Sequence, residues 1–241
     1  MQRHLSSPDW EFVLNLQGGR IEKLTYRKEL ILGTFDRKDG KKSNTHVCTP
    51  NFNREGTKEY GLPVHGPPRN TIWHVKTDDR TYFSIYCIVP ATDLYKAGLY
   101  VEQVFELRPG LFKQTVVVEN TQGSKVPVNI GIHNYWAVPH GWKGTRLNGC
   151  DISRLVETNG QRELRKSNTV RFPDGRRFRL QTKGFEDVKL WAAPDNNGVY
   201  DDAYVCIEPV LSLGTDYFGS KQSMLGEGKS FIASQEIGMI Y

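Results

Sequence analysis

Short stretches in which hydrophobic and polar residues alternate dominate this chain. Residues 10–16 place Phe12, Leu14 and Leu16 on one face, and residues 21–26 alternate again after a pair of glycines. Alternation with a period of two predicts strands with one buried face, and almost no stretch has the hydrophobic period of a helix. The pattern therefore predicts an all-β protein.

Further strands are predicted along the rest of the chain, between turns rich in glycine, proline and asparagine. Arg108-Pro109-Gly110 separates two long alternating stretches and predicts a hairpin. A single helical turn is predicted at residues 161–166. The other predicted strands cover residues 81–89, 99–107, 111–119, 126–132, 177–182, 188–192, 204–209 and 230–237.

Many short strands without intervening helices indicate a large antiparallel β-sandwich, or a barrel, and argue against a parallel sheet. No repeat and no low-complexity linker divides the sequence, so we expect residues 1–241 to form one domain. A chain of 241 residues with 38% hydrophobic residues is long enough to bury a sizeable core and does not have the composition of a disordered protein.

Charge and hydropathy argue against several classes of partner. The net charge is +5, but the excess is spread over short clusters without a basic, aromatic-rich stripe, so we expect no nucleic-acid binding. No hydrophobic run approaches the ~20 residues of a membrane span, and no signal-peptide pattern follows Met1, so we predict a cytoplasmic protein. The mild positive charge fits either a soluble surface or attraction of an anionic substrate such as a sugar phosphate.

Cysteine and glycine motifs that hold metals or nucleotides are missing from the sequence. The four cysteines form no CxxC pair and have no zinc-like spacing with histidine. No glycine-rich phosphate loop precedes a helix, and no G-x-S-x-G elbow is found. We therefore expect no metal and no cofactor.

Glu208 stands in an otherwise hydrophobic predicted strand, Tyr204-Val205-Cys206-Ile207-Glu208-Pro209-Val210. Loss of hydration raises the pKa of a carboxyl group and makes it a better base near neutral pH. Pro209 lacks a backbone donor, which predicts that the strand ends beside Glu208 at the rim of a cavity. A glutamate in a structural salt bridge is the alternative.

His133 is the second candidate. Alternation places Asn129, Gly131 and His133 on one face, where the glycine would leave room for a ligand close to the backbone. Histidine donates or accepts a proton near neutral pH, so His133 is a candidate acid or base, with a purely structural histidine as the alternative.

His65 and Arg69 belong to a segment stiffened by Gly66, Pro67 and Pro68. A stiff loop loses less entropy when it orients a ligand, so this segment is predicted to bind a polar ligand. An ordinary turn with an exposed arginine is the alternative. The other histidines have weaker contexts; they are His4, His46, His74 and His140.

Four segments, taken together and in order, resemble the aldose 1-epimerase (galactose mutarotase) family, and more narrowly its glucose-6-phosphate 1-epimerase branch. Residues 62–73 match a histidine-glycine, arginine-asparagine and tryptophan segment, and residues 131–136 match a histidine-x-tyrosine-aromatic segment. Residues 206–209 match the family's strand-end glutamate, and residues 225–228 match a glycine turn before the last strand. The family usually has an aromatic and a small residue where this chain has the two prolines at 67–68.

The resemblance implies a galactose mutarotase-like β-supersandwich that interconverts the α and β anomers of a hexose or hexose 6-phosphate. Glu208 would be the general base and His133 the general acid of ring opening and closure, and His65 and Arg69 would bind the substrate. It implies a small-molecule sugar or sugar phosphate as partner, in a monomer or homodimer. Two alternatives remain: a non-catalytic carbohydrate-binding module, and a structural or interaction protein on the same fold.

Overall fold

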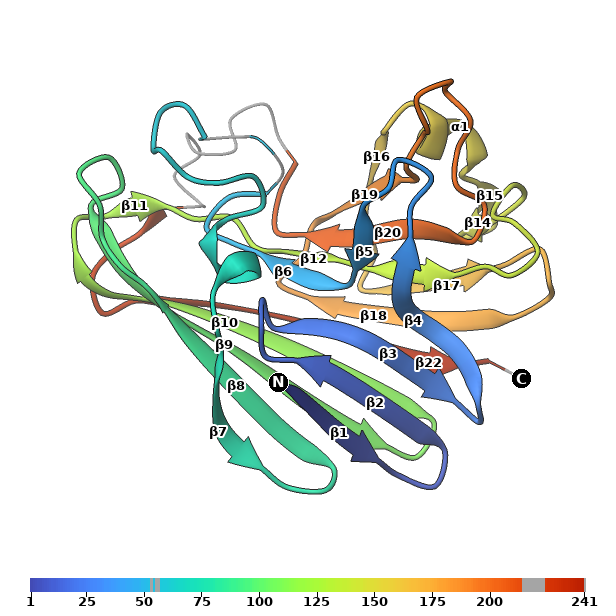
Figure 1. The fold of residues 1–241 in the computed structure, drawn as a ribbon, viewed down its shortest axis with the longest axis horizontal. Helices are drawn as coiled ribbons and strands as arrows, with labels where there is room; N and C mark the ends of the chain where they lie inside the picture. Colours follow the sequence, from blue (N-terminus) through green and yellow to red (C-terminus); the bar gives the residue numbers. More distant parts are fainter. Residues whose placement is uncertain (53, 55–56, 214–223, 241) are drawn as a thin grey trace.

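Two large antiparallel sheets make up most of the molecule (Figure 1). The computed structural model describes residues 1–240 except 53, 55–56 and 214–223. In this part of the chain, eleven strands form the larger sheet, whose main path runs β1-β2-β3-β4-β13-β20-β12-β6, with β5 beside β4, β19 beside β20 and β16 beside β19. They are β1 (Gln2–Ser6), β2 (Trp10–Asn15), β3 (Arg20–Tyr26), β4 (Glu29–Asp36), β5 (Lys42–Asn44), β6 (His46–Cys48), β12 (Gly131–His133), β13 (Tyr135–Ala137), β16 (Gln161–Glu163), β19 (Asp187–Trp191) and β20 (Tyr204–Val210).

The second sheet contains nine described strands in the order β15-β14-β17-β18-β22-β10-β9-β8-β7. They are β7 (His74–Asp78), β8 (Tyr82–Val89), β9 (Ala97–Arg108), β10 (Leu111–Gly123), β14 (Arg146–Leu147), β15 (Cys150–Asp151), β17 (Ser167–Arg171), β18 (Arg177–Lys183) and β22 (Ser230–Met239). A small ladder joins β11 (Val126–Pro127) to β21 (Met224–Leu225), and the helical segments described are the 3₁₀ turn η1 (Pro67–Asn70) and α1 (Ser153–Glu157).

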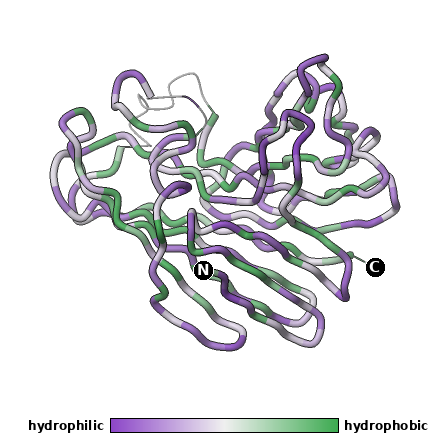
Figure 2. The backbone as a smooth tube through the Cα atoms, in the orientation of Figure 1, coloured by the Kyte–Doolittle hydropathy of each residue, from purple (hydrophilic) through white to green (hydrophobic). Residues whose placement is uncertain are grey.

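The hydrophobic core lies between the two sheets. Phe12 of the larger sheet packs against Phe105 and Phe112 of the other, with ring centroids 4.9 and 5.7 Å away. Hydrophobic residues are concentrated on the strands and hydrophilic residues at the turns (Figure 2). The alternation in the sequence therefore turns one face of each sheet inward, and the predicted all-β antiparallel sandwich is confirmed. None of the described residues forms a helix long and apolar enough to cross a membrane.

Three local predictions were wrong. The helical turn expected at 161–166 is instead strand β16, and the described α-helix lies at 153–157. The strand expected at 126–132 divides into β11 and β12. Strand β20 does not end beside Glu208 but continues through Pro209 to Val210. On one side of β20, β12 pairs at Val210 and β13 pairs at residues 204–206. Proline is tolerated at 209 because this ladder is interrupted between the two.

Candidate functional site

A row of four polar side chains crosses four neighbouring strands of the larger sheet. His133 pairs with His46 of β6, and Glu208 pairs with Lys189 of β19. Gly131 pairs with Val210 and Tyr135 with Cys206. His133 lies midway between Gly131 and Tyr135, and Glu208 lies midway between Val210 and Cys206. The two residues therefore lie opposite each other on neighbouring strands. Because residues in one register row share a face of the sheet, the order His46, His133, Glu208, Lys189 brings a possible acid and base side by side.

The His133 imidazole and the Glu208 carboxylate lie 3.5 Å apart, measured from Nδ1 to Oε2. Both side chains are buried, with 5% and 2% of their residue surfaces exposed. Burial raises the pKa of Glu208 well above its ordinary value, and the charge of Lys189 opposes this shift only in part. Burial also lowers the pKa of His133, and the neighbouring His46 adds to that shift. Both shifts favour the neutral forms of the two groups, a protonated carboxyl group and a neutral imidazole.

Aromatic rings hold His133 in place. The Tyr135 ring stacks on its imidazole with centroids 4.7 Å apart and planes 4° from parallel, and Trp191 meets it edge-on at 5.8 Å. The guanidinium of Arg37 lies 5.1 Å from the Trp191 ring and forms an ion pair with Asp39. These contacts leave the imidazole little freedom to rotate.

His46 belongs to the site although its sequence context predicted nothing. Its ring stacks on His133 at 5.1 Å, and its Nδ1 lies 2.8 Å from the carbonyl oxygen of Asn44. Because a carbonyl oxygen only accepts, Nδ1 carries the proton and Nε2 presents a lone pair. Burial, with added repulsion from His65, lowers the pKa of His46 and keeps the ring neutral. A histidine two residues from Cys48 was the only sequence signal that could have found it.

The stiff segment predicted at residues 65–69 is present and holds His65 in an unusual conformation. His65 has φ of +65°, in the left-handed region that β-carbon-bearing residues rarely adopt. The next residue, Gly66, passes so close to the carbonyl oxygen of Thr49 that a β-carbon would lie 1.7 Å from it. The imidazole of His65 meets His133 edge-on at 5.1 Å. Burial, and to a lesser extent the charge of Arg69, lowers the pKa of His65 to about 3.

Arg20 and Arg69 meet at the other side of the site. The guanidinium of Arg20 donates a hydrogen bond of 2.8 Å to the carbonyl oxygen of Arg69. Burial and the charge of Arg69 lower the pKa of Arg20. Within the described residues, no carboxylate lies within ion-pair distance of either side chain. Two neighbouring arginines without an acidic partner favour an anionic ligand.

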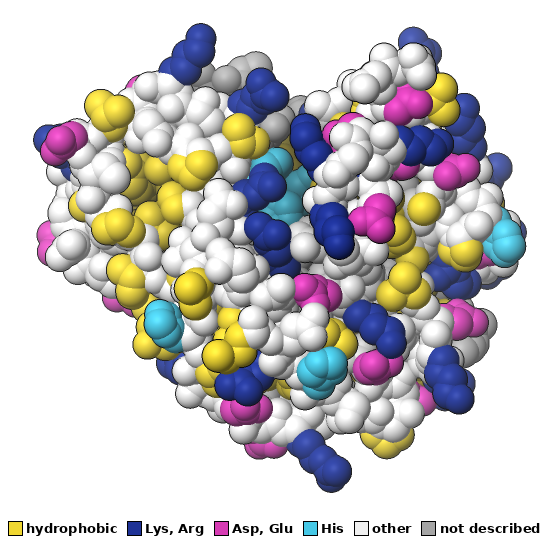
Figure 3. Space-filling model, viewed as in Figure 1, with side chains coloured by type: hydrophobic (Ala, Val, Ile, Leu, Met, Phe, Trp, Pro, Cys, Tyr) yellow, Lys and Arg dark blue, Asp and Glu magenta, His cyan; other side chains and the backbone are white. Residues whose placement is uncertain are grey.

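These side chains surround a cavity of about 610 Å³. Figure 3 shows histidine side chains in a hollow of the surface with lysine and arginine side chains around it. The lining is strongly basic, because seven of the described lining residues are Lys or Arg and Glu208 is the one acidic residue among them. The basic residues are Arg20, Arg37, Lys41, Lys42, Arg54, Arg69 and Lys189. The four residues predicted from the sequence, Glu208, His133, His65 and Arg69, all line this cavity.

The expected open space beside Gly131 is absent, and two nearby acidic residues lie outside the cavity. The space beside Gly131 is filled by Phe52, whose ring would lie 2.4 Å from an added β-carbon, so it is not open to a ligand as predicted. The side chain of Asp201 is buried and accepts hydrogen bonds from the Lys38 backbone and the Tyr204 hydroxyl. It does not line the cavity, and neither does its neighbour Asp202.

A chain of buried amide side chains runs from the acid–base pair through the second sheet and back to Arg20. Asn134 and Gln235 hydrogen-bond to each other, Gln235 donates to Gln114, Gln114 donates to Gln103, and Gln103 donates to the carbonyl oxygen of Gly19. At one end, Asn134 directly follows His133 in the sequence. At the other end, Gly19 directly precedes Arg20. Each of the four amides is fully buried and hydrogen-bonded, which fixes both ends of the site to one rigid core.

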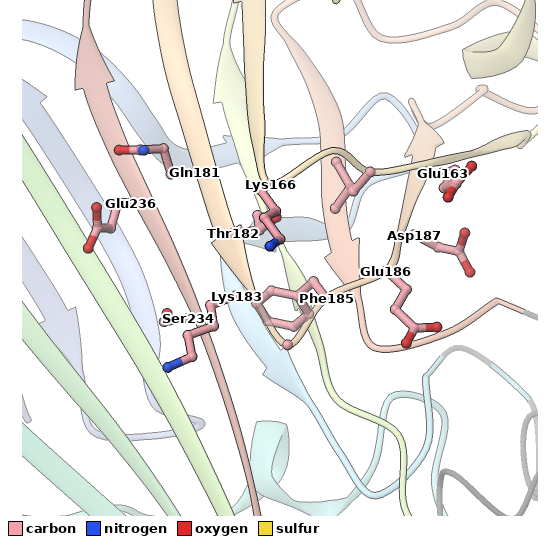
Figure 4. A pocket seen from close by; sticks show the side chains of 12 residues that line it. Glu163, Lys166, Gln181, Thr182, Lys183, Phe185, Glu186, Asp187, Ser234 and Glu236 are labelled. Atoms are coloured by element: carbon pink, nitrogen blue, oxygen red, sulfur yellow. The ribbon is translucent and has the colours of Figure 1, made fainter.

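A larger cavity of about 1030 Å³ lies elsewhere, at the ends of β16, β18 and β19 (Figure 4). Its charged side chains, including Lys183, Glu186 and Glu236, point in different directions, and no histidine is among the lining residues that the structure describes. Without converging groups or a proton-transfer pair, this cavity offers no chemistry comparable to that of the basic one.

The sandwich and its basic cavity define a β-sandwich protein of the galactose mutarotase-like class. The chain belongs to the aldose 1-epimerase family, whose family model matches residues 15–211. A comparison with curated proteins finds no match.

Solved structures share the fold over nearly their whole length. A galactose mutarotase-like protein from Lactobacillus casei is 15% identical, with a TM-score of 0.79 and all of both chains covered. A galactose mutarotase related enzyme from Lactobacillus acidophilus is 16% identical, with a TM-score of 0.78 and 100% and 98% of the two chains covered. Galactose 1-epimerase from Lactobacillus acidophilus is 12% identical, with a TM-score of 0.65 and 99% and 94% covered. At these identities the similarity shows the fold alone.

Proposed function

We propose that this protein is an aldose 1-epimerase that interconverts the α and β anomers of a hexose 6-phosphate. The observation that carries the proposal is the buried His133–Glu208 pair, opposed across 3.5 Å in a cavity large enough for a sugar. Family membership supports the reaction type. A purely carbohydrate-binding protein does not need a buried acid–base pair.

The reaction needs one group that accepts the proton of the C1 hydroxyl and one that donates a proton to the ring oxygen. Transfer of the shared proton from Glu208 to His133 produces a carboxylate and an imidazolium, and nearby basic groups such as Lys189 stabilise the carboxylate. Glu208 then accepts the C1 hydroxyl proton while His133 protonates the ring oxygen. The ring opens, the C1–C2 bond rotates, and closure on the other face reverses both proton transfers. Each well-placed group contributes about 10²–10⁴ in rate.

Binding is assigned to the other groups of the cavity. His65, held rigidly by its loop, would contact the hydroxyl or ring oxygens of the sugar. Arg20 and Arg69 would bind the 6-phosphate, because both line the cavity, the Arg20 guanidinium lies beside the Arg69 backbone, and neither has an ion-pair partner among the described residues. The basic lining as a whole favours an anionic sugar over a neutral one.

The test is an anomer-exchange measurement by NMR with a panel of free and 6-phosphorylated hexoses. We expect exchange above the spontaneous rate, fastest for a 6-phosphate. Binding without acceleration would indicate a carbohydrate-binding module, and equal acceleration of free and phosphorylated sugars would remove the phosphate preference. The single-domain organisation, the cytoplasmic location and the monomeric or homodimeric state stay predictions.

A further inference from the structure

His46, Cys48 and His65 bring two imidazoles and a thiol together beside the cavity. One possible ligand atom from each lies within 4.8 Å of those of the other two. His46 and Cys48 are two residues apart on β6 and therefore face the same side of the sheet. The thiol sulfur of Cys48 lies 3.2 Å from Nδ1 of His65. A site made of nitrogen and sulfur ligands is the type that Zn²⁺ prefers.

The state of His46 supplies a second, independent indication. Its Nδ1–H donates to the carbonyl oxygen of Asn44, and its Nε2 is buried without a hydrogen-bond partner among the described residues. An unpaired buried nitrogen is costly in a folded protein and calls for an explanation. Metal-binding histidines usually donate their other N–H to a carbonyl or carboxylate, which fixes the ring and directs the lone pair at the metal. His46 already has the hydrogen bond of this arrangement, and its Nε2 keeps the lone pair that a metal would need.

The local charge limits which metals the cluster can hold. Arg20 and Arg69 lie along the same cavity and repel any cation. When the metal binds, the Cys48 thiol releases its proton to solvent. The resulting thiolate offsets part of this repulsion and forms strong bonds only with soft or borderline ions, whereas Mg²⁺ and Ca²⁺ prefer oxygen ligands. The cluster should therefore select Zn²⁺ over the hard divalent ions.

We propose that His46, Cys48 and His65 form a Zn²⁺ site in the wall of the basic cavity, with the fourth coordination position open to the cavity. His46 and His65 both line the cavity, so an ion can enter from it, while Cys48 lies buried behind them. Zinc at this position occupies the space of the ligand and withdraws His65 from it. The site is therefore inhibitory: zinc and the sugar exclude each other.

Metal binding is tested on the purified, reduced full-length chain in the absence of any sugar. Zn²⁺ affinity is measured by competition with a chromophoric chelator, and Co²⁺ serves as a spectroscopic probe because a thiolate ligand produces a sulfur-to-cobalt charge-transfer band. We expect one Zn²⁺ per chain, no competition from Mg²⁺, and the charge-transfer band with Co²⁺.

Variants identify the ligands. Cys48→Ser should abolish the band and weaken Zn²⁺ binding by at least about tenfold, the loss typical of changes around metal sites. His46→Gln should weaken binding similarly, and it serves as the second test if Cys48→Ser does not fold. Cys150→Ser, at an exposed cysteine on β15, is the matched control and should change nothing.

A second cluster, made of His133, Cys206 and Glu208, provides the competing assignment. Loss of the cobalt band in Cys206→Ser but not in Cys48→Ser would overturn the proposal, as would absence of stoichiometric zinc binding. Because binding is measured without sugar, these outcomes are separate from failure of the epimerase proposal. With an active substrate, zinc should raise KM without lowering kcat, and an unchanged KM in the presence of bound zinc would refute the inhibitory role.

Discussion

Asn134 and Gln235 exchange two hydrogen bonds of 2.7 and 3.1 Å across the middle of the sandwich. Asn134 also donates to the carbonyl oxygen of Ile207, the residue before Glu208. Asn134 thereby links the two strands of the acid–base pair, because it follows His133 in the chain and its side chain bonds to β20. Its partner Gln235 belongs to the opposite sheet. The second sheet thus determines the position of groups that the first sheet carries.

Replacing Gln114 with Met should lower kcat while the protein remains folded. The change interrupts the amide chain at its centre, without contact with either end of the site, and leaves Gln103 and Gln235 each short of one partner. Each unpaired buried group costs about 1–3 kcal/mol of unfolding free energy. Val116→Ala, on the same face of β10, is the control for general loosening of the core. If both variants had the kcat of the wild type, compared at the same fraction of folded protein, the amide chain would have a structural role only.

Glu208→Gln should keep the fold and remove most activity, by about 10²–10⁴-fold. The amide preserves the shape of the carboxyl group but cannot accept the proton. Unfolding free energy at neutral pH should stay equal or rise, because a buried ionisable group with a raised pKa is removed. Anomer exchange and chemical denaturation measure the two effects, with the exposed Glu227→Gln as control. Turnover at the wild-type rate would show that Glu208 is not the base.

The pH dependence of kcat/KM should be bell-shaped, because the His133–Glu208 pair is active only with one proton. Uptake of a second proton by His133 gives the acid limb, which should lie below the ordinary histidine range because burial lowers that pKa. Loss of the last proton gives the alkaline limb, which should lie above the ordinary carboxyl range because the pKa of Glu208 is raised. His133→Asn should lower kcat more than it changes sugar affinity and should abolish the acid limb. A profile that is flat from mildly acidic to mildly alkaline pH would argue against this pair.

Arg69→Ala and Arg20→Ala should each raise the KM of a 6-phosphosugar more than that of the matching free sugar. Charge-assisted hydrogen bonds to a partly buried ligand contribute about 1.5–3 kcal/mol, so the expected difference is roughly tenfold or more. Added salt should raise the KM of the phosphorylated sugar alone, because salt screens charge pairs. Arg80→Ala, an exposed arginine outside the cavity, is the control. Equal losses for both sugars would place the arginines on ring hydroxyls.

Unfolding free energy should fall as the pH drops below about 6.5, the ordinary pKa of histidine. Three site histidines, His46, His65 and His133, have lowered pKa values, so the unfolded chain binds more protons in this range and acid favours unfolding. For His65 the range extends down to about pH 3. Each histidine contributes about 1.4 kcal/mol per pH unit at most. Above pH 4.5 the raised pKa of Glu208 makes the folded chain bind more protons, so acid stabilises the fold through this group. Its effect offsets the contribution of one histidine.

Urea denaturation between pH 8 and pH 5 measures this slope. His46→Gln should reduce it, since one proton-binding difference is removed, whereas the exposed His140→Gln should leave it unchanged. An identical slope in wild type and His46→Gln would show that His46 does not contribute.

The sequence by itself determined the fold class, and it pointed to four residues that the structure places in the lining of one cavity. Alternating hydrophobicity is a local property that follows from burial of one strand face, so the strands could be predicted. Glu208 and His133 could be singled out because an ionisable side chain is unusual in a predicted strand of mostly hydrophobic residues. The stiff loop was predicted because proline and glycine restrict or permit backbone angles locally.

Only the tertiary structure decided which strands lie next to one another. In the sequence, His46 had only Cys48 nearby as a signal, yet the pairing of β6 with β12 places it beside His133. Arg20 joins Arg69 across 49 residues. Register and contact between distant segments depend on the packing of the whole core, which no local pattern encodes.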